Sequence, residues 1–393
     1  MVCRLGEQRW RPMAPSGSFL VKLLLLLVAV IIFACTNTAQ GSRDMEPLEL
    51  WQQGKLRGAN VYFPPTGPSQ TPEEIADGLK ALRSWGANLV VVPLQRVYDP
   101  EAPYNFHPEA LAWTDLYVDA AKEAGLFVCV TCRTGPGRAD FNKSYEIYQQ
   151  PEAQEAYARM WRDIAKHYRD REIVVGYSVM CEPHPEDDYL KNGKTMAEAA
   201  EAMKGTPADW NALARRCTRA IREVDESKPI IIGATLWSYP QAFAFLEPTG
   251  DPRTVYAVHY YGPHGYSHQE PGGDVHYPGE VTGGHGGTTE MLNQETIRKA
   301  FEPVVCFQKE HKVPIFAGEF GCVRWAPDML DYLRDVMDVY EEQGWSCAYW
   351  VLRSWDAMDI EGVADAADKE RYPDTPQLQL FKTYFKRDDV FPK

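Results

Sequence analysis

The sequence predicts an α/β protein folded as a (β/α)8 TIM barrel, and three observations support this fold. From Leu56 onward, short runs of branched apolar residues alternate with longer stretches of helical periodicity, as in parallel strands joined by crossover helices. Eight such runs occur over about 330 residues, and barrels of this kind take roughly 250 to 400 residues. Runs such as NLVVVPL and PIIIGAT are almost wholly apolar, which is typical of strands buried on both faces.

Each element follows from this alternation. The predicted strands, in chain order, cover residues 56–62, 88–94, 126–132, 173–182, 229–235, 254–261, 313–321 and 346–355. The predicted helices cover residues 72–85, 108–124, 152–168, 207–224, 295–311 and 327–343. Pro72, Pro108 and Pro327 lie near the starts of three helices, where a missing N–H costs nothing because it has no intrahelical acceptor.

Composition places the chain among globular proteins. It has 393 residues, 45% hydrophobic and 24% charged, so disorder is excluded and one large domain or two ordinary ones fit. With 41 Lys and Arg against 55 Asp and Glu, the net charge of −14 repels nucleic-acid phosphates and anionic lipids. No local basic patch is visible along the sequence. We therefore expect no nucleic-acid partner. We also expect the protein to be a monomer.

The N-terminal segment is typical of an export signal. Residues 19–34 are apolar apart from Lys22 and follow a flank that contains three arginines. These 16 residues are too few for a membrane span, which needs about 20, but they suit a secretory signal. We predict a signal peptide over residues 1–34, a linker over 35–50 and a single barrel domain over 51–393.

The end of the apolar run also resembles a bacterial lipoprotein signal. In such signals small residues precede a cysteine that becomes lipidated, and Ala34-Cys35 fits this pattern, whereas Phe33 departs from it. Three outcomes stay open: a lipoprotein anchored through Cys35, a freely secreted protein, and an uncleaved anchor. All three export the domain, and we expect contact with a membrane only through such an anchor.

Polar residues gather where the predicted strands end, which is the edge that carries the active site in barrels of this type. They are Gln95, Arg96, Arg133, Glu182, His184, His259, Tyr261, Glu319, Arg353, Trp355 and Asp356. Glu182 follows IVVGYSVMC and Glu319 lies in VPIFAGEFG, apolar settings in which an ionised side chain is costly unless it is paired or used. One alternative is that each glutamate is only a salt-bridge partner. Two carboxylates about 5 Å apart, however, are what retaining glycoside hydrolysis requires.

Several motifs resemble glycoside hydrolase family 5, within clan A of the retaining barrel hydrolases. They are LRGANVYFP, GLKALRSWGANLVVVPL, SVMCEP with Glu182, the segment from His259 to Tyr261, IFAGEFG with Glu319, and AYW ending in Trp350. The resemblance spans about residues 56–355. It implies that Glu182 is the acid/base and Glu319 the nucleophile. It further implies that His259 and Tyr261 orient this pair and that Trp350 lies under the sugar.

Two positions depart from the family's pattern. Cys181 stands where the family usually has an Asn that binds the sugar 2-hydroxyl, and Val91 stands where it usually has an Arg. Arg133 lies near the position of a family His, and we interpret it as filling space left by the missing Arg. With Trp355 as a stacking surface, the predicted substrate-binding residues are Arg133, Cys181, His259, Tyr261, Trp350 and Trp355.

Two further features concern metals. The Gly-rich segment from Gly262 to Thr289 carries His264, His268, His276 and His285, and we interpret it as a loop over the substrate, with a metal site as the alternative. Cys129 and Cys132 form C-x-x-C, but on a strand they point to opposite faces, which argues against a metal or redox pair. We expect no metal and no cofactor.

The sequence therefore predicts an O-glycosyl hydrolase. Its substrate is expected to be a β-linked polysaccharide or oligosaccharide, as for an endo-β-glucanase or β-mannanase. The alternative, motivated by Cys181 and Val91, is a catalytically weakened carbohydrate-binding protein on a hydrolase barrel. An acyl hydrolase is disfavoured because no G-x-S-x-G motif occurs and Ser178 lies inside a predicted strand.

Overall fold

Eight parallel strands close into a barrel in the order β1, β10, β9, β6, β5, β4, β3, β2. The strands are β1 (Arg57–Asn60), β2 (Leu89–Leu94), β3 (Phe127–Cys132), β4 (Val174–Ser178), β5 (Ile230–Gly233), β6 (Thr254–Tyr260), β9 (Ile315–Phe320) and β10 (Ser346–Tyr349). Each lies within a predicted strand, so the predicted (β/α)8 barrel is confirmed. The computed structural model describes residues 45–140, 145–282, 289–386 and 390–392.

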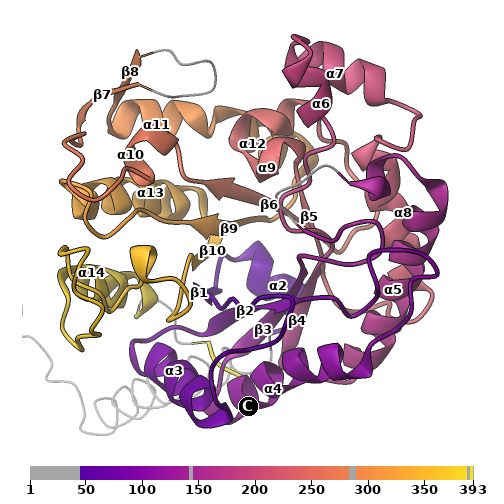
Figure 1. Cartoon of the computed structure of the whole chain (residues 1–393), viewed down its shortest axis with the longest axis horizontal. Coiled ribbons are helices and arrows are strands. Elements are labelled where there is room, and N and C mark those ends of the chain that lie inside the picture. The colour runs from indigo at the N-terminus through magenta and orange to yellow at the C-terminus, as the bar shows by residue number, and fades with distance from the viewer. Residues whose placement is uncertain (1–44, 141–144, 283–288, 387–389, 393) are drawn as a thin grey trace, which may run out of the picture. The chain divides into compact units, whose positions relative to one another are not determined.

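Helices surround the strands, as Figure 1 shows along the barrel. Those that join consecutive strands are α3 (Pro72–Ser84), α4 (Pro108–Ala124), α5 (Pro151–Tyr168), α8 (Trp210–Arg222), α11 (Gln294–Ala300), α12 (Glu302–His311) and α13 (Met329–Gln343). Thr71 caps α3 in a capping box with Glu74, and Gly125 ends α4 in the left-handed conformation, as helix-end chemistry predicts. The buried faces of these helices and the outer faces of the strands form one continuous core.

Several elements were not predicted. They are α2 (Pro47–Gln52), α6 (Asp187–Lys191), α7 (Met196–Met203), α9 (Thr235–Ser238), α10 (His264–Ser267), the antiparallel hairpin β7 (Gly279–Thr282) and β8 (Thr289–Leu292), α14 (Pro376–Phe385), and the 3₁₀ turns η1 (Glu146–Tyr148), η2 (Pro240–Phe245) and η3 (Asp356–Met358). The helix predicted over 295–311 is two helices, α11 and α12, which meet at Phe301.

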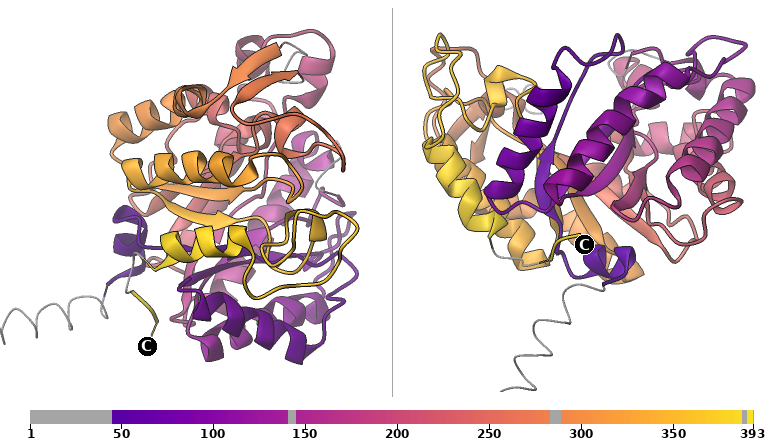
Figure 2. Two further views of the ribbon diagram at one scale, coloured as in Figure 1. Left: turned by 90° about the vertical axis from the view of Figure 1, so that its left-hand side faces the viewer. Right: turned by 90° about the horizontal axis from the view of Figure 1, so that it is seen from below.

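The two ends of the barrel differ. At the amino end, Trp51 of α2 is fully buried and donates from its indole Nε1 to the carbonyl of Val175 at 2.9 Å. In the left view of Figure 2, α2 lies at one end of the barrel and the gold loop after β10 at the other. The segment predicted as a linker thus ends in a helix that packs on the barrel. The carboxyl ends of the strands carry the polar residues.

The N-terminal predictions lie largely outside the described residues. Residues 1–34 and Cys35 are not among them, so the signal peptide and the lipid anchor stay predictions. Among the described residues, no helix has the length and apolar character needed to cross a membrane. The seven cysteines in this part of the chain are all free; Cys306 is exposed and the other six are buried.

Candidate active site

Glu182 and Glu319 face one another at the carboxyl end of the barrel. Glu319 lies within β9, as predicted. The strand before Glu182 ends at Ser178, four residues earlier than predicted. The chain nevertheless stays against its neighbours, because Val179 donates to the carbonyl of Ile231 at 3.0 Å and Cys181 to that of Cys132 at 2.8 Å.

The backbone of Glu182 has an unusual conformation. Its φ of 54° is in the left-handed region, which is unfavourable for a residue with a side chain. Its carbonyl accepts from Nδ1 of His184 at 2.7 Å and from Nη2 of Arg138 at 3.4 Å. These two buried side chains therefore hold the conformation that directs the Glu182 carboxylate towards His259.

The Glu319 carboxylate accepts hydrogen bonds from three side chains. Arg133 and Cys181 donate to Oε1, the latter at 3.4 Å, and Tyr261 donates to Oε2 at 3.1 Å. The contact between Tyr261 and Glu319 is the one that the resemblance implied. A Cβ at Gly318 would lie only 3.0 Å from Nε2 of His259. The glycine therefore lets the imidazole pack directly against the backbone of β9.

His259 bridges the two carboxylates. Its Nδ1 lies 2.9 Å from Oε1 of Glu182 and 3.8 Å from Oε2 of Glu319. Burial acts to raise the pKa of Glu182, but the hydrogen bond and charge of His259, together with the charge of Arg133, bring that pKa below its ordinary value. The free protein therefore favours the ionised form of Glu182.

Arg133 reaches the site from the end of β3 and is buried, with 1% of its surface exposed. Its guanidinium carbon lies 4.4 Å from the centre of the Trp350 ring and 5.6 Å from that of Tyr62. Val91 of β2 lies outside the core shared with the helices, although Val90 and Val92 belong to it, so Val91 faces the barrel interior. Arg133 thus supplies the guanidinium that Val91 cannot.

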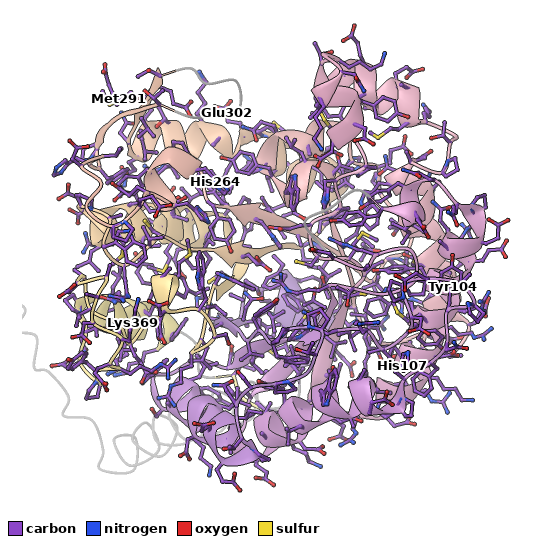
Figure 3. All side chains as sticks on the ribbon, viewed as in Figure 1. Tyr104, His107, His264, Met291, Glu302 and Lys369 are labelled. Atoms are coloured by element: carbon purple, nitrogen blue, oxygen red, sulfur yellow. The ribbon has the colours of Figure 1, made fainter. Side chains whose placement is uncertain are left out.

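Aromatic side chains extend the site away from the carboxylates. Trp350 is half-buried beneath Arg133, and Trp355 is 40% exposed. The ring centre of His268 lies 6.3 Å from that of Trp355 and 5.3 Å from that of Tyr261. His268 also stacks on His264, with their ring centres 4.1 Å apart. Figure 3 shows His264 between Met291 of the hairpin and the centre of the barrel. The aromatic residues therefore form a wall that leads from Glu319 to the surface.

The described part of the segment 262–289 has more regular structure than the predicted loop. It contains α10 and β7, and part of it lies outside the described residues. His276 bonds to Asp328 at 2.8 Å, while His264 and His268 lie by Tyr261. Among the described residues, the groups of three side chains able to hold a metal include no histidine of this segment, so the structure gives the metal alternative no support there.

Four polar residues predicted at the strand ends serve the loops instead. Gln95 donates to the carbonyl of Phe63 at 2.9 Å, and Arg96 has a left-handed backbone stabilised by Thr134. Arg353 pairs with Glu361, and Asp356 pairs with Lys369 at 2.6 Å.

A pocket of about 420 Å³ adjoins Glu182 through His184. Its wall is aromatic and acidic, with Tyr145, Tyr148, Asp187 and Tyr189 among the lining residues. The sequence did not indicate this pocket, because its wall comes from η1 and α6, two short elements without a clear periodicity.

Glu186, the residue before α6, is also buried. Its Oε1 accepts from the backbone of Leu236 at 2.7 Å, and among the described residues its Oε2 has no partner. Burial is the main cause that raises the pKa of Glu186 to about 8.

The structure brings together four arginines that lie in two separate parts of the sequence. Arg159 and Arg162 of α5 and Arg216 and Arg219 of α8 line one groove on the outside of the barrel, together with Glu155 and Glu223. Along the sequence these arginines are dispersed among acidic residues. In each helix the two arginines are three residues apart, so they lie on one face of that helix.

Comparison with known proteins agrees with this geometry. The model of the cellulase family, glycosyl hydrolase family 5, matches residues 52–356. Endoglucanase C of Acetivibrio thermocellus is 23% identical over 281 residues, covering 65% of this chain and 76% of that protein. A solved endoglucanase has a TM-score of 0.64 at 23% identity, covering 86% of this chain and 99% of that one. Endoglucanase Cel5A of Thermotoga maritima has a TM-score of 0.62 at 22% identity, over 86% and 100%.

The matched range contains both carboxylates and the residues that contact them. The resemblance inferred from the motifs is therefore confirmed, and so is the predicted class of enzyme. The chain belongs to glycosyl hydrolase family 5, a family of O-glycosyl hydrolases.

Proposed function

We propose that this protein is a retaining β-glycoside hydrolase that cleaves a β-linked polysaccharide or its oligosaccharides through a covalent glycosyl-enzyme. The observation that carries the proposal is the pair formed by Glu182 and Glu319, bridged by one imidazole nitrogen of His259. Glu319 attacks the anomeric carbon while Glu182 gives its proton to the leaving oxygen. Glu182 then takes a proton from water, which attacks the anomeric carbon and releases Glu319.

The separation of the carboxylates supports retention. Since one nitrogen lies 2.9 Å and 3.8 Å from the two oxygens, these oxygens are no further apart than the sum of the two distances. Retaining pairs are about 5–5.5 Å apart, whereas inverting pairs are about 6.5–9.5 Å apart to admit a water. This upper bound includes the whole retaining range and only the shortest inverting separations, so the pair suits direct attack by Glu319.

The proton for the leaving group comes from the same cluster. In the free protein, His259 favours the ionised form of Glu182. A bound sugar displaces water and places the leaving oxygen next to Glu182, which favours the neutral carboxylic acid. Arg133, Tyr261 and Cys181 meanwhile offset the charge of Glu319 until it reacts.

The relatives suggest the substrate class. Several are endoglucanases, and structures of Thermotoga maritima Cel5A contain cellobiose or mannotriose. We propose a β-glucan or β-mannan for this chain. The exposed Trp355 suits stacking on a sugar ring, and the pocket beside Glu182 suits the leaving part of the chain.

The alternative is a carbohydrate-binding protein with little turnover, and Cys181 and Val91 favour it. Arg133 weakens that alternative, because it returns a guanidinium to the nucleophile. For the rest of the chain we propose export through residues 1–34, which yields either a freely secreted protein or a lipoprotein anchored through Cys35, and a monomeric barrel domain.

Azide rescue distinguishes the roles of the two glutamates. Glu182→Ala should keep measurable turnover of dinitrophenyl β-glycosides, whose leaving group needs no proton, and azide should yield a β-glycosyl azide. Glu319→Ala should lose turnover, and azide should yield the α-glycosyl azide. The opposite pattern would reassign the roles. An inverted product from the wild-type protein, followed by NMR, would exclude the retaining mechanism.

A further inference from the structure

Cys181 brings a thiol to the bottom of the active site, beside Glu319. One ligand atom from each of Cys181, His259 and Glu319 lies within 4.8 Å of the others, and all three residues are buried. Among the described residues, these three side chains make up the one such group. Thiolate, imidazole and carboxylate are the ligands that zinc prefers in proteins. We propose that this group binds a zinc-type divalent ion, which inhibits the enzyme by occupying both carboxylates.

The spacing of the donors fits a tetrahedral ion. Metal–ligand bonds of about 2.0–2.3 Å place tetrahedral ligands about 3.3–3.8 Å apart. The sulfur of Cys181 lies 3.4 Å from Oε1 of Glu319, and Nδ1 of His259 lies 3.8 Å from Oε2. Glu182 lies 2.9 Å from the same nitrogen and supplies a fourth oxygen. These distances involve both oxygens of Glu319, and the three ligand atoms lie within 4.8 Å of one another, so the side chains surround one ion after rotating towards a common centre.

The imidazole already presents the correct nitrogen. Its Nε2 faces the backbone of Gly318, where a Cβ would lie only 3.0 Å away. Nδ1 faces the two carboxylates. Cys181, Glu319 and His259 keep 3%, 5% and 7% of their surface exposed, so a small ion can reach them from the cleft.

The charges balance when the ion binds. Without metal, Arg133 pairs with Glu319 and His259 pairs with Glu182. A divalent ion replaces the thiol proton and the proton through which Nδ1 of His259 bonds Glu182. Both protons pass to water, so two carboxylates and one thiolate then face the divalent ion and the guanidinium of Arg133. The ion forms bonds to sulfur, nitrogen and oxygen, and nothing is oxidised or reduced. Because it holds both Glu182 and Glu319, neither carboxylate can reach a sugar.

This inference rests on the proposed function for its activity readout alone, because binding can be measured directly. Titration of the full-length protein with Zn²⁺ by calorimetry should give one site, and titration with Co²⁺ should give the near-ultraviolet band of thiolate bound to cobalt. Cys181→Ser should weaken Zn²⁺ binding at least tenfold and abolish that band. Cys181→Asn provides a second variant in case the serine variant does not fold. Cys306→Ser, which removes the exposed thiol, is the matched control and should bind as wild type does.

For each variant, the inhibition constant for Zn²⁺ is measured relative to turnover of that variant without metal. It should rise as the dissociation constant for Zn²⁺ rises. Unchanged Zn²⁺ affinity in the folded Cys181 variants, or loss of the site in Cys306→Ser, would overturn the proposal. If no glycoside is hydrolysed by any variant, the proposed function fails, while the cobalt band still decides the metal site.

Discussion

Arg133→Met tests whether the guanidinium at the end of β3 is what makes Glu319 a usable nucleophile. Methionine keeps an unbranched apolar side chain against Trp350 and removes the donor to Oε1. The carboxylate then keeps Tyr261 at 3.1 Å and the weak S–H donor of Cys181 at 3.4 Å. We expect Glu319 to turn away from the anomeric carbon towards other donors, or to take up a proton, and either change removes the nucleophile.

The magnitude follows from burial. The side chains of Arg133 and Glu319 are only 2% and 7% exposed. Removing one partner of a buried ion pair costs about 3–5 kcal/mol, because the remaining charge is left without a counterpart. The two remaining donors offset part of this cost, which leaves about 3 kcal/mol. If this loss falls on the transition state, kcat/KM falls by about two orders of magnitude.

The assay uses a short aryl β-glycoside, with the rate of inactivation by an activated 2-fluoro glycoside as a direct measure of attack by Glu319. Arg133→Lys keeps the charge but not the planar fork, and it should lose about tenfold. Val91→Arg added to Arg133→Met should recover part of the lost rate if β2 can supply the donor. A folded Arg133→Met protein with wild-type kcat/KM would refute this account of Glu319.

Three further predictions concern other residues. Cys181→Asn should raise kcat/KM about tenfold, because an amide bonds the sugar 2-hydroxyl better than a thiol; an equal gain with a 2-deoxy substrate would contradict this reason. Trp355→Ala should raise KM for polymeric substrate about three- to tenfold through lost stacking, with a smaller rise for a short aryl glycoside, and equal rises would place Trp355 outside the binding surface. The third concerns Glu186, whose folded-state pKa of about 8 lies above the value of about 4.3 expected when unfolded. The folded protein thus keeps a proton that the unfolded chain loses, so wild-type stability falls between about pH 4.5 and 8. As the pH rises through this window, the unfolding midpoint of Glu186→Gln should rise relative to that of the wild type, by an amount equivalent to a few kcal/mol. A difference between the two midpoints that stays constant with pH would contradict this.

The barrel was predictable because its strands are buried on both faces and its helices repeat with a period of 3.6 residues. Both signals are local. The signal for α14 was also present, since Pro376 can begin a helix and Leu378, Phe381 and Phe385 recur at helical spacing. Its role was not predictable, because Phe381 packs at 4.5 Å on Tyr349 of β10, a contact between elements distant in the sequence.

The active site shows the same division more sharply. The apolar run before Glu182 correctly indicated a carboxylate at the barrel end, but not the φ of 54° that aims it, since that depends on Arg138 and His184 holding its carbonyl. The motifs indicated which residues come together, and the hydrogen bond from Tyr261 to Glu319 matches them.

At Val91, comparing one position at a time with the family pattern gave too low an expectation of how well the site supports Glu319. A missing arginine on β2 suggests a weakened nucleophile only if no other cation can take its place. Arg133 is 186 residues from Glu319 in sequence and reaches it from β3. What Glu319 needs is a positive charge and a donor within hydrogen-bond distance in a buried setting, and the barrel brings several strand ends close enough to supply them. A substitution at one strand end therefore decides activity only together with the side chains of neighbouring strand ends. Among the described residues, the side chains that donate to the Glu319 carboxylate are Arg133, Cys181 and Tyr261, and none of them is an amide. We therefore expect the rate of catalysis to depend on Cys181 more than on Val91.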